Sequence, residues 1–182
     1  KFSLLLTMSL ATSVFLAACG GSDDKASDSG SSSEDVVQEL RVLESAEIPS
    51  MDSIMAEDTV SFTMLNNVNE GLYRQDQENN IIPGVANGEP EVNEEGTEFT
   101  VKLKEGLTWS NGTALTAADF VFAWQRAIDP ANASTYGSYM MDGKIAGAQE
   151  ITEAAAAGQD YDVTTLGVEA VDETTLVVTT AK

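Results

Sequence analysis

The fold is decided by residues 99–126, which read FTVKLKEGLTWSNGTALTAADFVFAWQR. Apolar and polar residues alternate from Phe99 to Leu103, which is the pattern of a half-buried β-strand. Asn111-Gly112 follows and favours a tight turn, because both residues tolerate positive φ. The stretch therefore predicts a strand and a turn that lead into a helix.

The predicted helix begins at a motif that resembles a capping box. Thr116 and Asp119 are three positions apart, so the threonine hydroxyl and the aspartate carboxylate can each satisfy a backbone N–H at the helix start. Asp129-Pro130 ends the helix, because the residue before a proline avoids helical geometry. One face is apolar and predicts a core contact: Phe120, Val121, Trp124, Ala127 and Ile128.

Weaker patterns flank this stretch. Residues 40–45 alternate in polarity and predict a strand. Asp58 and Thr59 can cap a helix over residues 60–69, which Gly71 would end. A short strand is expected at residues 72–74.

Near the end of the chain, residues 168–171 and 175–179 predict a hairpin around Asp172-Glu173. The fold class is therefore mixed, with both helices and strands (α/β with α+β elements).

Cys19 is the only cysteine, and it closes the run Leu16-Ala17-Ala18-Cys19 behind a short apolar segment. It cannot form an internal disulfide, and the two small residues before it suit a signal peptidase. The arrangement resembles the lipobox of bacterial lipoproteins, which predicts a signal peptide at residues 1–18 and a lipid on the Cys19 sulfur. The alternative is an incidental cysteine after an uncleaved anchor helix, although the segment is shorter than the ~20 residues that span a membrane.

Residues 19–36 are rich in Gly, Ser and Asp, and predict a flexible tether between the lipid and the folded part. The alternative is a disordered terminus without a role.

Composition excludes several classes of function. Nine Lys and Arg stand against 30 Asp and Glu, giving a formal net charge of −21, which repels nucleic acid. The chain has no histidine, the usual general base near neutral pH and a common metal ligand. These features disfavour a nucleic-acid partner, a metal site and catalysis by a histidine base. From the sequence as a whole, we expect no enzymatic activity, no cofactor, no metal site and no nucleic-acid partner.

Taken together, residues 99–126 resemble the signature region of extracellular oligopeptide-binding proteins, the receptors of peptide ATP-binding-cassette (ABC) importers. Residues 69–73 and 83–86 resemble its upstream companions, and residues 129–130, 134–139 and 162–168 resemble downstream ones. The resemblance covers almost everything after residue 40.

This family implies a type II periplasmic-binding-protein-like fold with two lobes and a subdomain inserted in the first. Residues 37–61 and 161–182 would then be first-lobe segments, and residues 62–160 the inserted subdomain. The chain would be an N-terminal fragment that lacks the second lobe.

By the same resemblance, Glu57, Asp58, Thr59 and Tyr136 would contact an extended peptide. Two structural alternatives stay open. Glu57 could be a helix-start carboxylate favoured by the helix dipole. Tyr136, expected in a loop rich in Ser, Thr and Gly, could instead be a packing aromatic.

We thus expect a monomeric receptor, anchored by lipid through Cys19 on the extracellular face of the cell membrane (Gram-positive favoured, or the periplasmic side in a Gram-negative cell). It would bind short peptides and pass them to the membrane subunits of an ABC permease. The alternative ligands are a peptide pheromone, nickel or a disaccharide. A tethered hydrolase or adhesin is the alternative from another class; it would need a nucleophile–base constellation or internal repeats, and the sequence shows neither.

Overall fold

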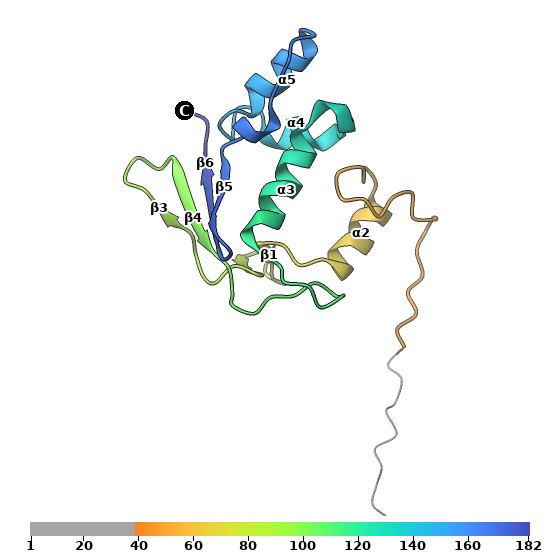
Figure 1. The fold of residues 1–182 in the computed structure, drawn as a ribbon. Helices are drawn as coiled ribbons and strands as arrows, with labels where there is room; N and C mark the ends of the chain where they lie inside the picture. Colours follow the sequence, from red (N-terminus) through yellow and green to blue (C-terminus); the bar gives the residue numbers. More distant parts are fainter. Residues whose placement is uncertain (1–38) are drawn as a thin grey trace, which may run out of the picture. The chain divides into compact units, whose positions relative to one another are not determined.

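The computed structural model of the chain describes residues 39–182, and the predictions of a signal peptide, a lipidated Cys19 and a tether lie outside these residues. Residues 43–182 form one unit. Its elements, in chain order (Figure 1), are α2 (Thr59–Val68), β1 (Tyr73–Gln75), β2 (Ile81–Pro83), β3 (Glu91–Val92), β4 (Glu98–Lys102), α3 (Ala117–Ile128), the 3₁₀ turn η1 (Pro130–Asn132), α4 (Thr135–Met141), α5 (Ala148–Ala156), the 3₁₀ turn η2 (Val163–Thr165), β5 (Val168–Asp172) and β6 (Thr175–Thr179).

The main sheet has four antiparallel strands in the order β3-β4-β6-β5. In the central pair, Glu98 of β4 lies opposite Thr179 of β6, and Lys102 lies opposite Thr175. The Lys102 ammonium also donates a hydrogen bond of 2.7 Å to the Thr175 hydroxyl. The strand predicted from Phe99 is therefore confirmed, and it occupies the middle of the sheet.

The predicted hairpin is also confirmed. β5 and β6 pair with a bulge between Ala170 and Asp172. The Asp172 carboxylate accepts hydrogen bonds from the backbone N–H of Thr174, at 2.8 Å, and from the hydroxyl of Thr175, also at 2.8 Å. These bonds close the turn and also lower the pKa of Asp172, because they stabilise its charged form.

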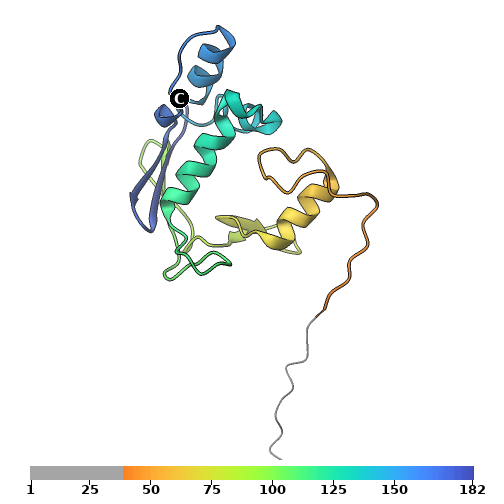
Figure 2. The same ribbon diagram turned by 45° about the vertical axis from the view of Figure 1, so that its right-hand side comes forward.

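α3 packs against β5 and β6 and supplies the main contact between helix and sheet (Figures 1 and 2). It starts as predicted: the Asp119 carboxylate accepts hydrogen bonds from the Thr116 backbone N–H, at 2.7 Å, and from the Thr116 hydroxyl, at 3.1 Å. The apolar face expected for this helix joins the core. Ile128 is buried, and Phe120, Val121 and Trp124 pack against the buried cluster.

α2 begins after Asp58, close to the predicted start, and ends at Val68, before Gly71. Val60 and Leu65 of this helix are buried, whereas Val68 is exposed. The short strand expected next in the chain is present as β1, which pairs with β2 in a separate two-stranded sheet.

Two predictions of local structure are wrong. Residues 40–45 belong to neither sheet, and Leu43 is 96% exposed. An alternating pattern makes a strand only where it pairs with a neighbouring strand, and residues 40–45 pair with no strand of the two described sheets. Tyr136 lies in α4 and not in a loop, because the Ser134 hydroxyl caps this helix by accepting the Gly137 N–H at 3.2 Å.

α4 packs closely on α3 at Gly137. An added Cβ at this glycine would lie 1.8 Å from the carbonyl oxygen of Ala127, which is far inside van der Waals contact. Only a residue without a side chain allows this approach of the two helices.

We predict that Gly137→Ala destabilises the protein. Alanine gains about 0.8–1 kcal/mol of helix propensity, but the clash with a backbone atom should cost about 1–3 kcal/mol or more, so the net effect is a lower melting temperature. Ser138→Ala, one position along the same helix, is the matched control. Equal melting temperatures for Gly137→Ala and Ser138→Ala would contradict the prediction, because α3 and α4 would then move apart without a loss of stability.

Candidate functional site

The residues predicted to contact a ligand come from two parts of the chain: the start of α2 and the start of α4. Glu57 and Thr59 are exposed on either side of Asp58, which is the N-cap of α2. Tyr136 is the second residue of α4.

A hydrogen bond joins them directly. The hydroxyl of Thr135 donates to the Glu57 carboxylate, although the two residues are 78 positions apart. Thr135 precedes Tyr136, so Glu57 lies beside the tyrosine. The backbone of Asp58 is extended, with φ −123° and ψ 157°, where the chain enters α2.

Asp58 itself has a structural task. Its two carboxylate oxygens accept hydrogen bonds from the backbone N–H of Ser61, at 2.9 Å, and from the Ser61 hydroxyl, at 2.7 Å. These bonds favour the ionised form and lower the pKa of Asp58 below its ordinary value. Because capping occupies both oxygens, a ligand contact through this side chain stays a prediction.

An aromatic cluster surrounds Tyr136. Its ring centroid is 6.0 Å from that of Phe62 on α2 and 6.3 Å from that of Tyr139 on α4, both within the range of favourable aromatic pairs. The rings stay open to solvent, with residue exposures of 38% for Phe62, 40% for Tyr136 and 71% for Tyr139. Part of each ring is therefore accessible, and a ligand contact through Tyr136 stays a prediction.

Sequence reasoning missed Phe62, Tyr139 and Thr135. Tyr139 stands three positions after Tyr136, which puts both rings on one face of a helix. That signal was readable in principle, but only after residues 135–141 had been assigned to a helix. Phe62 gives no comparable signal, because its place beside Tyr136 depends on tertiary structure.

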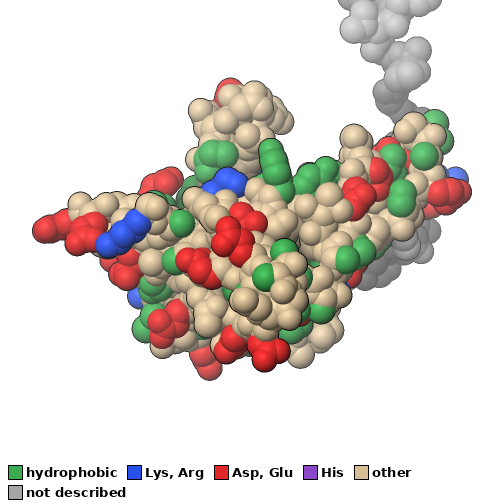
Figure 3. Space-filling view, turned by 90° about the horizontal axis from the view of Figure 1, so that it is seen from above, with side chains coloured by type: hydrophobic (Ala, Val, Ile, Leu, Met, Phe, Trp, Pro, Cys, Tyr) green, Lys and Arg blue, Asp and Glu red, His purple; other side chains and the backbone are tan. Residues whose placement is uncertain are grey.

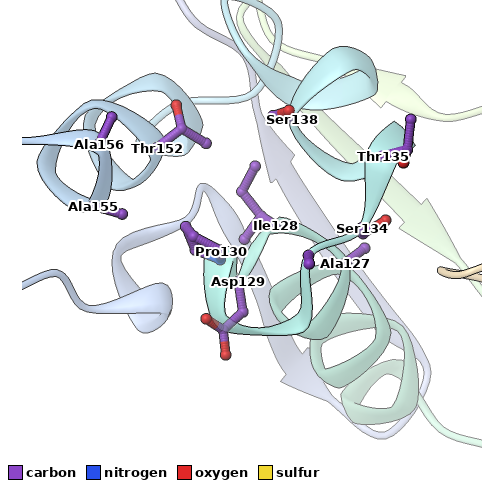
Figure 4. A pocket seen from close by; sticks show the side chains of 11 residues that line it. Ala127, Ile128, Asp129, Pro130, Ser134, Thr135, Ser138, Thr152, Ala155 and Ala156 are labelled. Atoms are coloured by element: carbon purple, nitrogen blue, oxygen red, sulfur yellow. The ribbon is translucent and has the colours of Figure 1, made fainter.

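A pocket of about 480 Å³ lies between the end of α3, η1, α4 and α5 (Figure 4). Thr135 and Ser138 line it from α4, and Thr152, Ala155 and Ala156 line it from α5. Its lining consists mostly of small residues and hydroxyl groups, with the carboxylate of Asp129 as the charged group, so it offers both hydrogen bonds and a negative charge.

The described part of the chain shows neither a candidate metal cluster nor a candidate membrane span. Over residues 39–182, no group of three or more Asp, Glu, His or Cys side chains is arranged to hold a metal ion. In the same range, no helix has both the length and the apolar character needed to cross a membrane. Acidic side chains outnumber basic ones on the face in Figure 3.

Comparison with known proteins defines the class. The family model described as bacterial extracellular solute-binding proteins, family 5 middle, matches residues 80–182. The dipeptide-binding protein of Lactococcus lactis is 38% identical over 136 residues, which cover 75% of this chain and 23% of that protein. The periplasmic oligopeptide-binding protein OppA of Escherichia coli is 39% identical over 134 residues, 74% of this chain and 23% of that protein.

The fold agrees with solved structures. The structure of Listeria monocytogenes OppA bound to peptide matches with a TM-score of 0.69 at 42% identity, over 76% of this chain and 26% of that chain. The mixed fold predicted from the sequence is confirmed over the matched part.

The chain belongs to the family 5 bacterial extracellular solute-binding proteins. It spans about a quarter of the length of the relatives it matches. This family consists of solute-binding proteins and not of enzymes, in agreement with the prediction of no catalysis.

We predict that stability falls in acid through the capping aspartates. The folded pKa of Asp58 lies below its unfolded value, so the stabilisation from the cap is present above the unfolded pKa and is lost as pH falls through the folded one. Thermal melts should therefore be nearly independent of pH near neutrality and decline most steeply below about pH 4.

The control for this prediction is Asp58→Asn, which keeps an acceptor for the Ser61 N–H but does not titrate. It should show a shallower decline in melting temperature below about pH 4. A decline as steep as that of the unchanged protein would assign the acid sensitivity to other carboxylates, such as Asp52 or Asp172.

Proposed function

We propose that this chain is part of a receptor that binds short peptides and delivers them to an ABC permease. The observation that carries the proposal is the hydrogen bond from Thr135 to Glu57, which joins the start of α4 to the segment before α2. The family resemblance predicts a peptide contact in each of these two parts of the chain, at Tyr136 and at Glu57. Two relatives named for dipeptide and oligopeptide binding, and the likeness to a peptide-bound structure, support it.

The site has features that suit peptides of many sequences. An extended backbone at Asp58 can present main-chain groups to an extended ligand, as a strand edge does, without reading side chains. The open rings of Phe62, Tyr136 and Tyr139 offer flat surfaces of broad specificity. The acidic excess of the chain favours peptides that carry positive charge.

The other lobe of the receptor would complete this site. We propose that residues 37–61 and 161–182 belong to the first lobe and residues 62–160 to a subdomain inserted in it. The main sheet combines β4, which precedes residue 160, with β5 and β6, which follow it. The subdomain would therefore share this sheet with the first lobe.

Lipid attachment at Cys19 and an extracellular location complete the proposal. The sequence of residues 16–19, the apolar segment before them and the tether after them support it. A thioether-linked diacylglycerol carries two acyl chains, which suffice for stable anchoring.

We predict that Tyr136→Ala, introduced in the whole receptor that contains this chain, weakens peptide binding and leaves the fold intact. The tyrosine ring is open to solvent, so its loss should cost binding about 1 kcal/mol or more. Trp124 packs against the core, so Trp124→Ala should instead cost about 3 kcal/mol or more of stability. Calorimetric titration with a pool of short peptides, and thermal melts of both variants, separate the two roles.

Tyr136→Phe serves as the matched control and separates the ring from the hydroxyl. Near-normal affinity for this variant would assign the contribution to the ring. A Tyr136→Ala variant with unchanged affinity and a melting temperature as low as that of Trp124→Ala would make Tyr136 a packing residue.

We also predict that Cys19→Ser abolishes lipid attachment and leaves the signal peptide uncleaved by the lipoprotein peptidase. The serine hydroxyl cannot form the thioether. Cells labelled with a radioactive fatty acid and then fractionated should show label in the unchanged protein alone. Label retained by the serine variant would contradict the lipobox assignment.

A further inference from the structure

We propose that the ion pair between Asp52 and Arg126 is a positioning clamp, which sets where Glu57 and Thr59 lie relative to Tyr136. The inference rests on the proposed function, since it concerns the geometry of the same site. It is carried by a set of contacts between residues 50–58, called the docking segment below, and the end of α3 with the start of α4.

Asp52 shapes the docking segment from within. Its backbone carbonyl accepts hydrogen bonds from the N–H groups of Met55 and Ala56, both at 3.0 Å, and its Oδ1 accepts the Ile54 N–H at 3.2 Å. Ala56, at the end of this turn, is buried and stands directly before Glu57. The position of Asp52 therefore sets the position of the backbone that follows the turn, including that of Glu57.

Arg126 ties this turn to α3. Its two terminal nitrogens donate to the two carboxylate oxygens of Asp52, at 2.8 Å and 2.6 Å. Two parallel bonds from a planar guanidinium fix the orientation of the carboxylate as well as its distance. Because α3 packs on β5 and β6, the pair connects the docking segment to the most firmly held helix of the unit.

Two further contacts lead from the clamp toward Tyr136. The Ser134 hydroxyl donates to the Ile54 carbonyl at 2.6 Å, and the Thr135 hydroxyl donates to Glu57. Both donors lie at the start of α4, directly before the tyrosine. The clamp and these two bonds thus hold the docking segment, which includes Glu57, against the start of α4, which includes Tyr136.

The clamp acts on position more than on global stability. Both side chains are 37% exposed, and ion pairs at such sites contribute little to the free energy of unfolding. The hydrogen bond from Arg126 nevertheless lowers the pKa of Asp52, so the carboxylate is ionised and the pair intact at neutral pH. Its loss should free the docking segment without unfolding the unit.

The test uses the whole receptor that contains this chain, with variants that remove the pair in graded ways. Arg126→Ala removes the guanidinium, and Arg126→Lys keeps a charge but cannot make both bonds. Asp52→Asn keeps an acceptor for the Ile54 N–H and loses the charge. The matched control is Arg74→Ala, which breaks the exposed Glu70–Arg74 pair of 3.2 Å on another part of the unit.

Three measurements are made on each variant: hydrogen exchange, thermal melting and affinity for trialanine as a probe with small side chains. In Arg126→Ala, exchange should speed up in residues 50–61 and not in β4 or β6, with a melting temperature close to that of the unchanged protein. Affinity should fall between about 2-fold and 30-fold. In exchange rate and in affinity, Arg126→Lys should lie between Arg126→Ala and the unchanged protein. Arg74→Ala should match the unchanged protein in all three measurements.

A double variant decides whether the two residues act as a unit. Asp52→Asn combined with Arg126→Ala should lose no more affinity than Arg126→Ala alone. Additive losses, unchanged exchange in residues 50–61, or a melting temperature that falls in step with affinity would each overturn the clamp. If the unchanged receptor does not bind trialanine, that result counts against the proposed ligand and not against the clamp. The hydrogen-exchange data on residues 50–61 then show by themselves whether the ion pair holds the docking segment.

Discussion

The packing of α3 on the β5–β6 hairpin is the constraint on which the remaining contacts depend. The last turn of this helix makes four different connections. Arg126 holds the docking segment, the Ala127 carbonyl contacts Gly137, Ile128 is buried in the core, and the Asp129 carboxylate accepts the Tyr161 hydroxyl at 2.9 Å. A helix that could slide on the sheet would move all four together.

Much of the fold was predictable because its signals are local. The strand from Phe99, the start of α3 at Thr116 and the β5–β6 hairpin are each specified by residues within a few positions of one another. Residues 40–45 show where this fails, since their pattern matches a strand but they pair with no strand of the described sheets. The helix at Tyr136 was missed because Ser, Thr and Gly favour loops unless a cap, here Ser134, stabilises the first turn.

The candidate site was predictable only through resemblance to a family. Glu57 and Tyr136 share no local pattern, and their proximity arises from the Thr135 hydrogen bond and the Asp52–Arg126 pair. Partners that distant in sequence cannot be paired by periodicity. The aromatic ring of Phe62 reaches the site for the same reason, through tertiary structure alone.

The pairing of β4 with β6 affects how the chain folds during its synthesis. Lys102 and Thr175 are 73 positions apart, so β4 leaves the ribosome well before its main partner. In that interval its only partner in the sheet is the two-residue strand β3, and Val101, buried in the finished unit, lacks its cover. The helices between these strands can form earlier, because their contacts are local. Until residue 179 has emerged, β4 therefore lacks its main partner, and its apolar side chains are open to aggregation.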